Sequence, residues 1–198
     1  LEVFTLAAST DMDALRRALD VGAHIGAAIV QVVVEDPERS RAIERFGNLC
    51  DAAAPLGLRV ALEFMQWRAV KTVGDANAFL STAGRPNGGL CIDCLHLSRS
   101  GGSPSAVASV PVERVHYVQL CDARARLPAR EELIVEARGR RAYPGEGELW
   151  LKELLNVVPP TVPLSIEVPR VIDERLTARE RAKNAALALH RFLGASSS

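Results

Sequence analysis

The sequence predicts an α/β fold of the (β/α)8 barrel type, formed by one domain over residues 1–198. Apolar strands alternate with amphipathic helices along the chain, which is typical of βαβ units around a parallel sheet, and about six such units can be counted. Several of the expected strands end in a polar side chain that is costly to bury alone. A chain of 198 residues is long enough for a full hydrophobic core and fits one domain better than two.

The first half of the chain contains three expected strand–helix pairs. Apolar runs bounded by turn residues predict strands over residues 1–6, 28–34 and 58–64. The second strand is apolar apart from Gln31, as expected for a strand buried on both faces of a parallel sheet. Thr10 is expected to cap the first helix and Pro37 to begin the second. Gly57 and Gly84 are expected to end the second and third helices.

The second half continues the alternation around one long excursion. Strands are expected over residues 90–94, 115–121 and 163–168, and helices over residues 148–157 and 173–193. A Ser/Gly-rich loop is expected to follow the first of these strands. The arginine-rich excursion over residues 122–147 leaves a strand at its C-terminal end, so we expect it to cover the site as a lid. Residues 196–198 are expected to form a frayed tail.

Composition argues against several classes of function. The chain is 48% hydrophobic and 24% charged with a formal net charge of +0, so neither a nucleic-acid partner nor an anionic membrane is expected. No apolar run approaches the length of a membrane span, and the opening residues are expected to form a strand rather than a signal peptide. The four cysteines do not suggest a disulfide scaffold in a chain of this size. We therefore expect a cytoplasmic protein that acts on a small molecule.

Polar residues at the strand ends point to a shared cation. Glu63, Asp93, Gln119 and Glu167 each lie at or near the end of an apolar strand. In a barrel the C-terminal ends of all strands converge on one axis, so these side chains are expected to meet around one ion. In an open, doubly wound sheet they would lie in a line, and this difference favours the barrel. The alternative is that each carboxylate caps a loop or pairs with an arginine.

The ligand types narrow the choice of metal. Three carboxylates and one amide oxygen suit Mn²⁺ or Mg²⁺, with Co²⁺ as a further option, and disfavour a structural Zn²⁺ site built on thiolates. Four protein oxygens leave room for two substrate oxygens, which a hydroxy-carbonyl compound supplies. A Zn²⁺ or redox site at Cys91 and Cys94 is not expected, because alternation within the predicted strand places these thiols on opposite faces.

The chain resembles the sugar phosphate isomerase/epimerase family, the xylose-isomerase-like TIM barrels. The matching segments are ALEF at 61–64, IDCLHLSRSG at 92–101, VQLCD at 118–122, PGEGE at 144–148 and IEVP at 166–169. The resemblance covers essentially the whole chain and implies that the four strand-end residues hold one divalent metal. Family barrels have eight βα units, so it also implies that the first two are lacking and that Leu1 begins the third. The third ligand is often His in the family, whereas Gln119 here favours an all-oxygen site.

The resemblance also implies a reaction. The metal would polarise a carbonyl and stabilise the enediolate that forms when a neighbouring proton leaves. By resemblance to the epimerases, Glu63 and Glu167 would act as the acid and the base. His96 is expected to bond a substrate oxygen and to shuttle a proton, unless it only caps a loop. Arg99 and Arg138 are candidate anion contacts for the substrate, with solvated arginines as the alternative.

Three functions remain open at this point. The first is a metal-dependent isomerase or epimerase of a small sugar, sugar phosphate or related hydroxy-ketone, in carbohydrate metabolism. The second is a lyase similar to 3-dehydroshikimate dehydratase, with which Gln119 is compatible. The third is a catalytically inactive partial barrel that binds or oligomerises, and a homo-oligomer is plausible because two units are lacking. The DNA-repair endonuclease branch is disfavoured, since its further ligands and a basic surface are not found.

Overall fold

Six parallel strands form one curved sheet. The computed structural model describes residues 4–194. The strands are β1 (Phe4–Leu6), β2 (Ile29–Val34), β3 (Arg59–Glu63), β4 (Gly88–Asp93), β5 (Val115–Leu120) and β6 (Leu164–Ile166). Each strand pairs in parallel with the next, in the order β1-β2-β3-β4-β5-β6. A sheet wound in one direction is the wall of a (β/α)8 barrel, whereas the strand order of a doubly wound sheet reverses. The predicted fold class is confirmed.

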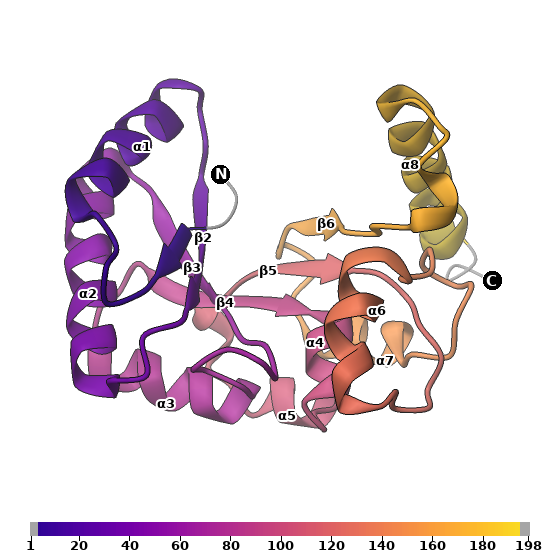
Figure 1. Ribbon diagram of the computed structural model, residues 1–198, viewed down its shortest axis with the longest axis horizontal. Helices are drawn as coiled ribbons and strands as arrows, with labels where there is room; N and C mark the ends of the chain where they lie inside the picture. Colours follow the sequence, from indigo (N-terminus) through magenta and orange to yellow (C-terminus); the bar gives the residue numbers. More distant parts are fainter. Residues whose placement is uncertain (1–3, 195–198) are drawn as a thin grey trace.

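Helices follow the strands and cover the outside of the sheet (Figure 1). They are α1 (Met12–His24), α2 (Arg39–Ala53), α3 (Val73–Ala83), α4 (Cys94–Arg99), α5 (Pro104–Ala108), α6 (Leu133–Gly139), α7 (Leu151–Val157) and α8 (Ala178–Gly194). Figure 1 shows the sheet as an arc, with α1 near one end and α8 near the other. Within residues 4–194, β1 and β6 each pair with one strand only, so the described part of the barrel wall is open.

The hydrophobic core lies between the sheet and the helices. Val60 and Leu62 of β3 belong to this core together with Phe46 of α2 and Phe79 of α3. The two phenylalanine rings meet edge to face, with centroids 5.6 Å apart, a geometry that stabilises beyond burial alone. Because side chains alternate along a strand, Ala61 and Glu63, which alternate with these core positions, face the inside of the arc.

Local hydrogen bonds move several predicted boundaries. Asp11 caps α1 by accepting from two backbone N–H groups, while the hydroxyl of Thr10 donates to the carbonyl of Thr5, so the predicted cap was wrong by one residue. The C-terminal helix begins at Ala178 rather than at residue 173. Thr177 and Glu180 form a reciprocal capping box there, which satisfies the free N–H groups of the first turn.

The segment that follows β4 contains two short helices, and the Ser/Gly-rich stretch at residues 100–103 forms the turn between them. Cys94 begins α4 directly after β4 rather than ending the strand, and α5 follows four residues after α4 ends. Residues 1–3 of the first predicted strand and the predicted tail at 196–198 lie outside the described residues. Among residues 4–194, no helix is both long enough and apolar enough to cross a membrane.

The excursion over residues 122–147 is an ordered segment that returns to the sheet. Asp122 forms an antiparallel bridge with Ala142. Its buried carboxylate also accepts hydrogen bonds from the backbone N–H groups of Gly145 and Leu149, at 3.0 Å each. These bonds close the base of the excursion, and α6 extends from it. Movement of this segment as a lid stays a prediction.

Candidate metal centre

Four predicted ligands lie at the same edge of the sheet. Glu63 ends β3 and Asp93 ends β4, while Gln119 is the last but one residue of β5 and pairs with Asp93 in the register. Glu167 follows β6 directly, and its backbone N–H donates to the carbonyl of Leu120 at 3.1 Å. Because all the strands are parallel, these ends share one edge, as the barrel geometry requires.

The tightest cluster of metal-binding groups contains a histidine. One ligand atom from each of Glu63, Asp93 and His96 lies within 4.8 Å of the other two, and all three residues are buried. Asp93 brings His96 into place, since its side chain caps α4 by accepting from the His96 backbone N–H at 2.8 Å. The His96 ring packs edge to face on Trp67, with centroids 5.1 Å apart. The Nε2 atom of His96 lies 3.6 Å from Glu63 Oε1, and its Nδ1 is buried with no hydrogen-bond partner among residues 4–194.

A small cavity of about 160 Å³ adjoins this cluster. It is lined by Gln31, Glu63, Met65, Trp67, Arg68, His96, Gln119, Ala137, Arg138, Arg141 and Glu167. The structure therefore brings five of the predicted site residues to one cavity. Asp93 lies behind its wall and is fully buried.

The buried Glu63 carboxylate is stable in its charged form only if a positive charge lies beside it. Burial first, and then the negative charges of Asp93 and Glu167, raise the pKa of Glu63 well above its usual range. The amide of Gln31 opposes this rise by donating to Glu63 Oε2 at 2.6 Å, and Tyr117 in turn donates to the Gln31 carbonyl oxygen. A divalent ion beside these carboxylates would favour their charged forms, so the donor set fits a cation.

Arg141 balances part of this negative charge. Its Nη1 donates to Asp93 Oδ2 at 2.5 Å and lies 3.5 Å from Glu167 Oε2, while its Nε donates to the carbonyl of Ala137 at 2.9 Å. Burial opposes the ionisation of Asp93, but the charge of Arg141, helped by His96 and by hydrogen bonds, lowers the pKa of Asp93 to about 2. Arg141 was not among the predicted site residues. Its position three residues before the PGEGE segment at 144–148, which carries part of the family resemblance, is the sequence feature that could have indicated it.

Gln119 and Glu167 line the cavity beside the cluster of Glu63, Asp93 and His96. The carbonyl oxygen of Gln119 accepts from the Cys91 thiol at 2.8 Å. The side chain of Glu167 is 39% exposed, against 3% for Glu63. The ligands that fit an ion best are therefore Glu63, Asp93 and His96, with Gln119 and Glu167 within the same cavity. This set contains an imidazole nitrogen, so it suits Mn²⁺, Co²⁺ or Zn²⁺ as well as Mg²⁺.

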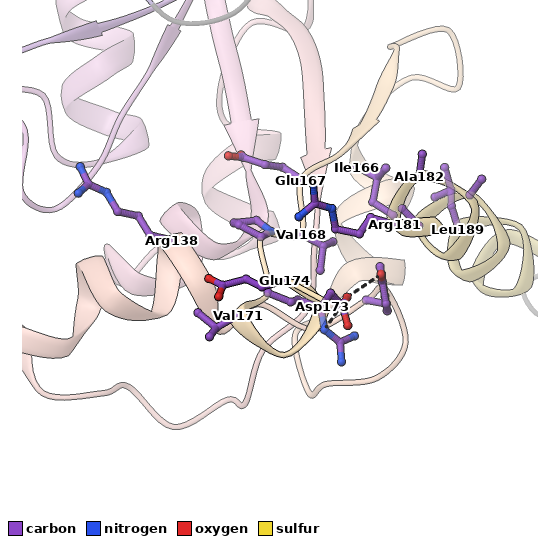
Figure 2. A pocket seen from close by; sticks show the side chains of 15 residues that line it. Arg138, Ile166, Glu167, Val168, Val171, Asp173, Glu174, Arg181, Ala182 and Leu189 are labelled. Carbon is purple, nitrogen blue, oxygen red and sulfur yellow. Dashed lines mark hydrogen bonds and ion pairs between the residues drawn. The ribbon is translucent and has the colours of Figure 1, made fainter. Parts of the chain in front are cut away.

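The two predicted anion contacts differ in their surroundings. Arg99 is 3% exposed and does not line the cavity. Its guanidinium donates two hydrogen bonds of 2.7 Å to the Glu136 carboxylate, which ties α4 to α6. Arg138 is exposed and lines both the cavity and a larger hollow of about 770 Å³ between the end of β6 and α8 (Figure 2). Glu167 lines both spaces too.

Two curated proteins match the chain in sequence. A 3-dehydroshikimate dehydratase of Pseudomonas aeruginosa is 33% identical over 129 residues, which cover 61% of this chain and 19% of that protein. A 3-dehydroshikimate dehydratase of Pseudomonas putida is 27% identical over 193 residues, covering 92% of this chain and 29% of that protein. The chain thus spans less than a third of the length of these relatives.

Solved structures share the fold at low sequence identity. The IOLI protein with a bound zinc atom superposes with a TM-score of 0.84 at 20% identity, covering 97% of this chain and 74% of that chain. The D-allulose 3-epimerase of Methylomonas sp. gives a TM-score of 0.67 at 20% identity, over 94% of this chain and 68% of that chain. A family model described as the xylose isomerase-like TIM barrel matches residues 7–191. The chain therefore belongs to the xylose isomerase-like TIM barrel family.

Proposed function

We propose that this chain carries the site of a divalent-metal-dependent enzyme that removes a proton from a carbon next to a carbonyl group. The observation that supports the proposal most is the convergence of Glu63, Asp93 and His96 beside a small cavity that Gln119 and Glu167 also line. The cavity of about 160 Å³ is lined by both charged and amide side chains, which supports a polar small-molecule substrate.

The metal is held by Glu63, Asp93 and His96 in this proposal, with Gln119 and Glu167 as additional oxygen donors. When bound, it stabilises the negative charge that develops on the carbonyl oxygen as the proton leaves. Asp93 supports this role because Arg141 keeps it ionised, with a pKa of about 2. Gln31 supports it by fixing one oxygen of Glu63 with a hydrogen bond of 2.6 Å.

Proton transfer is assigned to the two glutamates. Glu167 accepts the proton from carbon, because it is the most exposed carboxylate of the site and lies 3.5 Å from the Arg141 charge. Glu63 is the second acid–base group. It ends β3 and lines the same cavity, so it faces the substrate from a different strand end than Glu167. Burial lowers the pKa of His96 to about 4, so its ring is neutral near pH 7, as a metal ligand must be, and it is not assigned a proton.

Dehydration is the reaction we propose first. After the proton leaves the α carbon, the hydroxyl on the β carbon departs with a proton as water, and a carbon–carbon double bond forms. Both curated relatives are named 3-dehydroshikimate dehydratase, which supports this reaction over the isomerisation that the sequence analysis placed first.

Epimerisation is the second candidate. It shares the first step but returns the proton to the same carbon from the other face, and this needs two acid–base groups around the substrate. Glu63 and Glu167 on separate strands support it, as does the fold shared with D-allulose 3-epimerase. The catalytically inactive barrel stays a third hypothesis, and metal binding tests it.

Two assays separate these functions. The protein with Mn²⁺ is incubated with 3-dehydroshikimate, and dehydration is detected as a new aromatic absorbance. Epimerisation is detected in D₂O by NMR, as deuterium entering D-allulose next to its carbonyl. A chelator should abolish either activity. Saturable Mn²⁺ binding without turnover or deuterium exchange would contradict the proposal, and absence of saturable binding would favour the inactive barrel.

A further inference from the structure

We propose that Arg170 is a positioning residue for Glu167, the carboxylate to which removal of the proton from carbon is assigned. It acts through four side chains, Tyr143, Glu146, Arg170 and Asp173, which we call the Arg170 network and which join the segment after β6 to the end of the excursion. This inference rests on the proposed function, because it concerns the base of that reaction. Arg170 does not line the small cavity, so its role is to hold Glu167 rather than to contact the substrate there.

The sheet alone gives Glu167 little support. Glu167 follows β6, a strand of three half-buried residues that pairs only with β5 among the described strands. One backbone hydrogen bond continues this pairing, from the N–H of Glu167 to the carbonyl of Leu120 at 3.1 Å. Helix α8, which comes next in the chain, buries only Phe192 among its described side chains. The position of Glu167 therefore depends on contacts beyond the sheet.

The end of the excursion lies alongside the residues after β6. Arg140 forms an antiparallel backbone bridge with Arg170. One residue earlier, Gly139 lies so close to Val171 that an added Cβ atom would be 2.7 Å from its Cγ2. A side chain at position 139 would push the two segments apart, which explains a glycine at this close approach. The backbones of the two segments are therefore in direct contact.

Arg170 is at the centre of the side-chain contacts between these segments. Its Nη1 donates to Glu146 at 3.0 Å, and its Nε lies 3.4 Å from Asp173 Oδ2. Its guanidinium lies over the ring of Tyr143, 4.5 Å from the centroid. The Tyr143 hydroxyl donates to the same Asp173 oxygen at 3.0 Å (dashed lines at Asp173 in Figure 2). Two side chains of the excursion thus meet two side chains of the segment that carries Glu167.

The Arg170 network is more than a solvated surface ion pair. The side chains of Arg170 and Asp173 are 20% and 15% exposed, and Tyr143 is buried. Partly buried charges are screened less than exposed ones, and a cation over an aromatic ring adds a further attraction. Loss of Arg170 should therefore loosen the segment after β6. The interior strands that hold Glu63 and Asp93 do not contact this network through the pairing of the sheet and should stay in place.

Amide exchange tests the support of Glu167 without any turnover. In Arg170→Met, hydrogen–deuterium exchange at the Glu167 amide should be on the order of tenfold faster, because local opening of the segment exposes that N–H. Exchange at the ends of β3 and β4 should not change. Arg170→Lys keeps a cation beside Glu146 and the Tyr143 ring, so it should restore part of the protection.

Kinetics of the Mn²⁺-loaded protein show whether this support positions the base. We expect kcat to fall on the order of tenfold in Arg170→Met, with KM changed by less than about twofold, because a displaced base slows proton transfer while the cavity lining is kept. Arg170→Lys should recover part of kcat. Urea unfolding of each variant is measured alongside, so that a loss of folded protein is not mistaken for a loss of positioning.

Arg39→Met is the matched control. Arg39 also lies over an aromatic ring, 5.6 Å from the centroid of Phe79, and it pairs with Asp75 at 2.7 Å, but it joins α2 to α3 away from the cavity. This variant should keep both kcat and the slow exchange of the Glu167 amide. A comparable change in Arg39→Met would show that any such loss acts through general stability.

The outcomes separate the positioning role from the proposed reaction. Unchanged exchange at the Glu167 amide in Arg170→Met would overturn the role of the network. Faster exchange with an unchanged kcat in an active protein would overturn it too, because the base would then not depend on the network. If the wild-type protein shows neither dehydration nor deuterium uptake by substrate, faster amide exchange in Arg170→Met alone would support the hold on Glu167, and only the proposed reaction would be rejected.

Discussion

The two sides of the candidate site, one with Glu63 and Asp93 and the other with Glu167, differ in how deeply their side chains and strands are buried. On one side, Glu63 and Asp93 end interior strands, and their side chains are almost completely buried. On the other side, Glu167 follows the edge strand β6, whose three residues are all half-buried, and α8 behind it buries only Phe192 among its described side chains. A strand that pairs on both sides fixes the position of its terminal side chain. The position of an edge strand depends more on the helix or loop that packs against it. The metal-side residues are therefore preorganised, and Glu167 has more freedom.

The largest expected effect is a loss of stability when Asp93 is replaced. Asp93→Ala removes the cap of α4 and leaves the buried Arg141 without its 2.5 Å partner. We expect a loss of about 3–5 kcal/mol in the free energy of unfolding, measured in urea, because an unpaired buried charge is strongly destabilising. The double variant Asp93→Ala with Arg141→Met should recover part of that loss. No recovery would show that the ion pair is not the cause.

Glu167→Gln is expected to separate activity from stability. Turnover should fall by about 10²–10⁴-fold, since a positioned acid–base group contributes that much. The free energy of unfolding should change by less than about 0.5 kcal/mol, because the side chain is partly exposed. Glu174→Gln is the matched control, as Glu174 lines the same larger hollow. Normal turnover in Glu167→Gln would remove Glu167 from the mechanism.

His96 should make the free energy of unfolding of the metal-free protein sensitive to acid. Burial lowers its pKa from 6.5 to about 4, so between these values the unfolded chain binds a proton that the folded protein excludes. Stability should therefore fall as the pH drops through this window, by at most about 3 kcal/mol.

The corresponding measurement is urea unfolding at pH 7 and pH 4.5 in the presence of a chelator. His96→Asn should lose less stability between the two conditions than the wild-type protein, whereas the exposed His190→Asn should behave like the wild type. Equal acid sensitivity in His96→Asn would show that other groups carry the effect.

The smallest expected effect concerns the support behind Glu63. Tyr117→Phe removes the hydroxyl that donates to Gln31, whose amide then holds Glu63 less firmly. We expect a loss of about 1 kcal/mol in stability, as for one hydrogen bond, and a modest fall in Mn²⁺ affinity by titration. An unchanged affinity would mean that Glu63 keeps its position without this chain of bonds.

Much of the architecture was predictable because it depends on local patterns. The alternation of apolar strands and helices predicted all six strands, and the polar residue at each strand end predicted Glu63 and Asp93 at one edge. Helix starts were less predictable. Neighbouring polar residues compete to cap them, so Asp11 took the place expected for Thr10.

The partners of the site residues were decided by the tertiary structure. The sequence predicted that His96 and Glu63 share a site, but not that their side chains lie within one metal cluster, that Arg141 pairs with Asp93, or that Glu136 pairs with Arg99. The residues of each pair are separated by 33, 48 and 37 positions, and their side chains meet only after the sheet has curved and α6 has folded back onto it. Periodicity determines which face of a strand or helix a residue occupies. The charged partner of that residue depends on how distant segments pack against each other. Only the tertiary structure determines this packing.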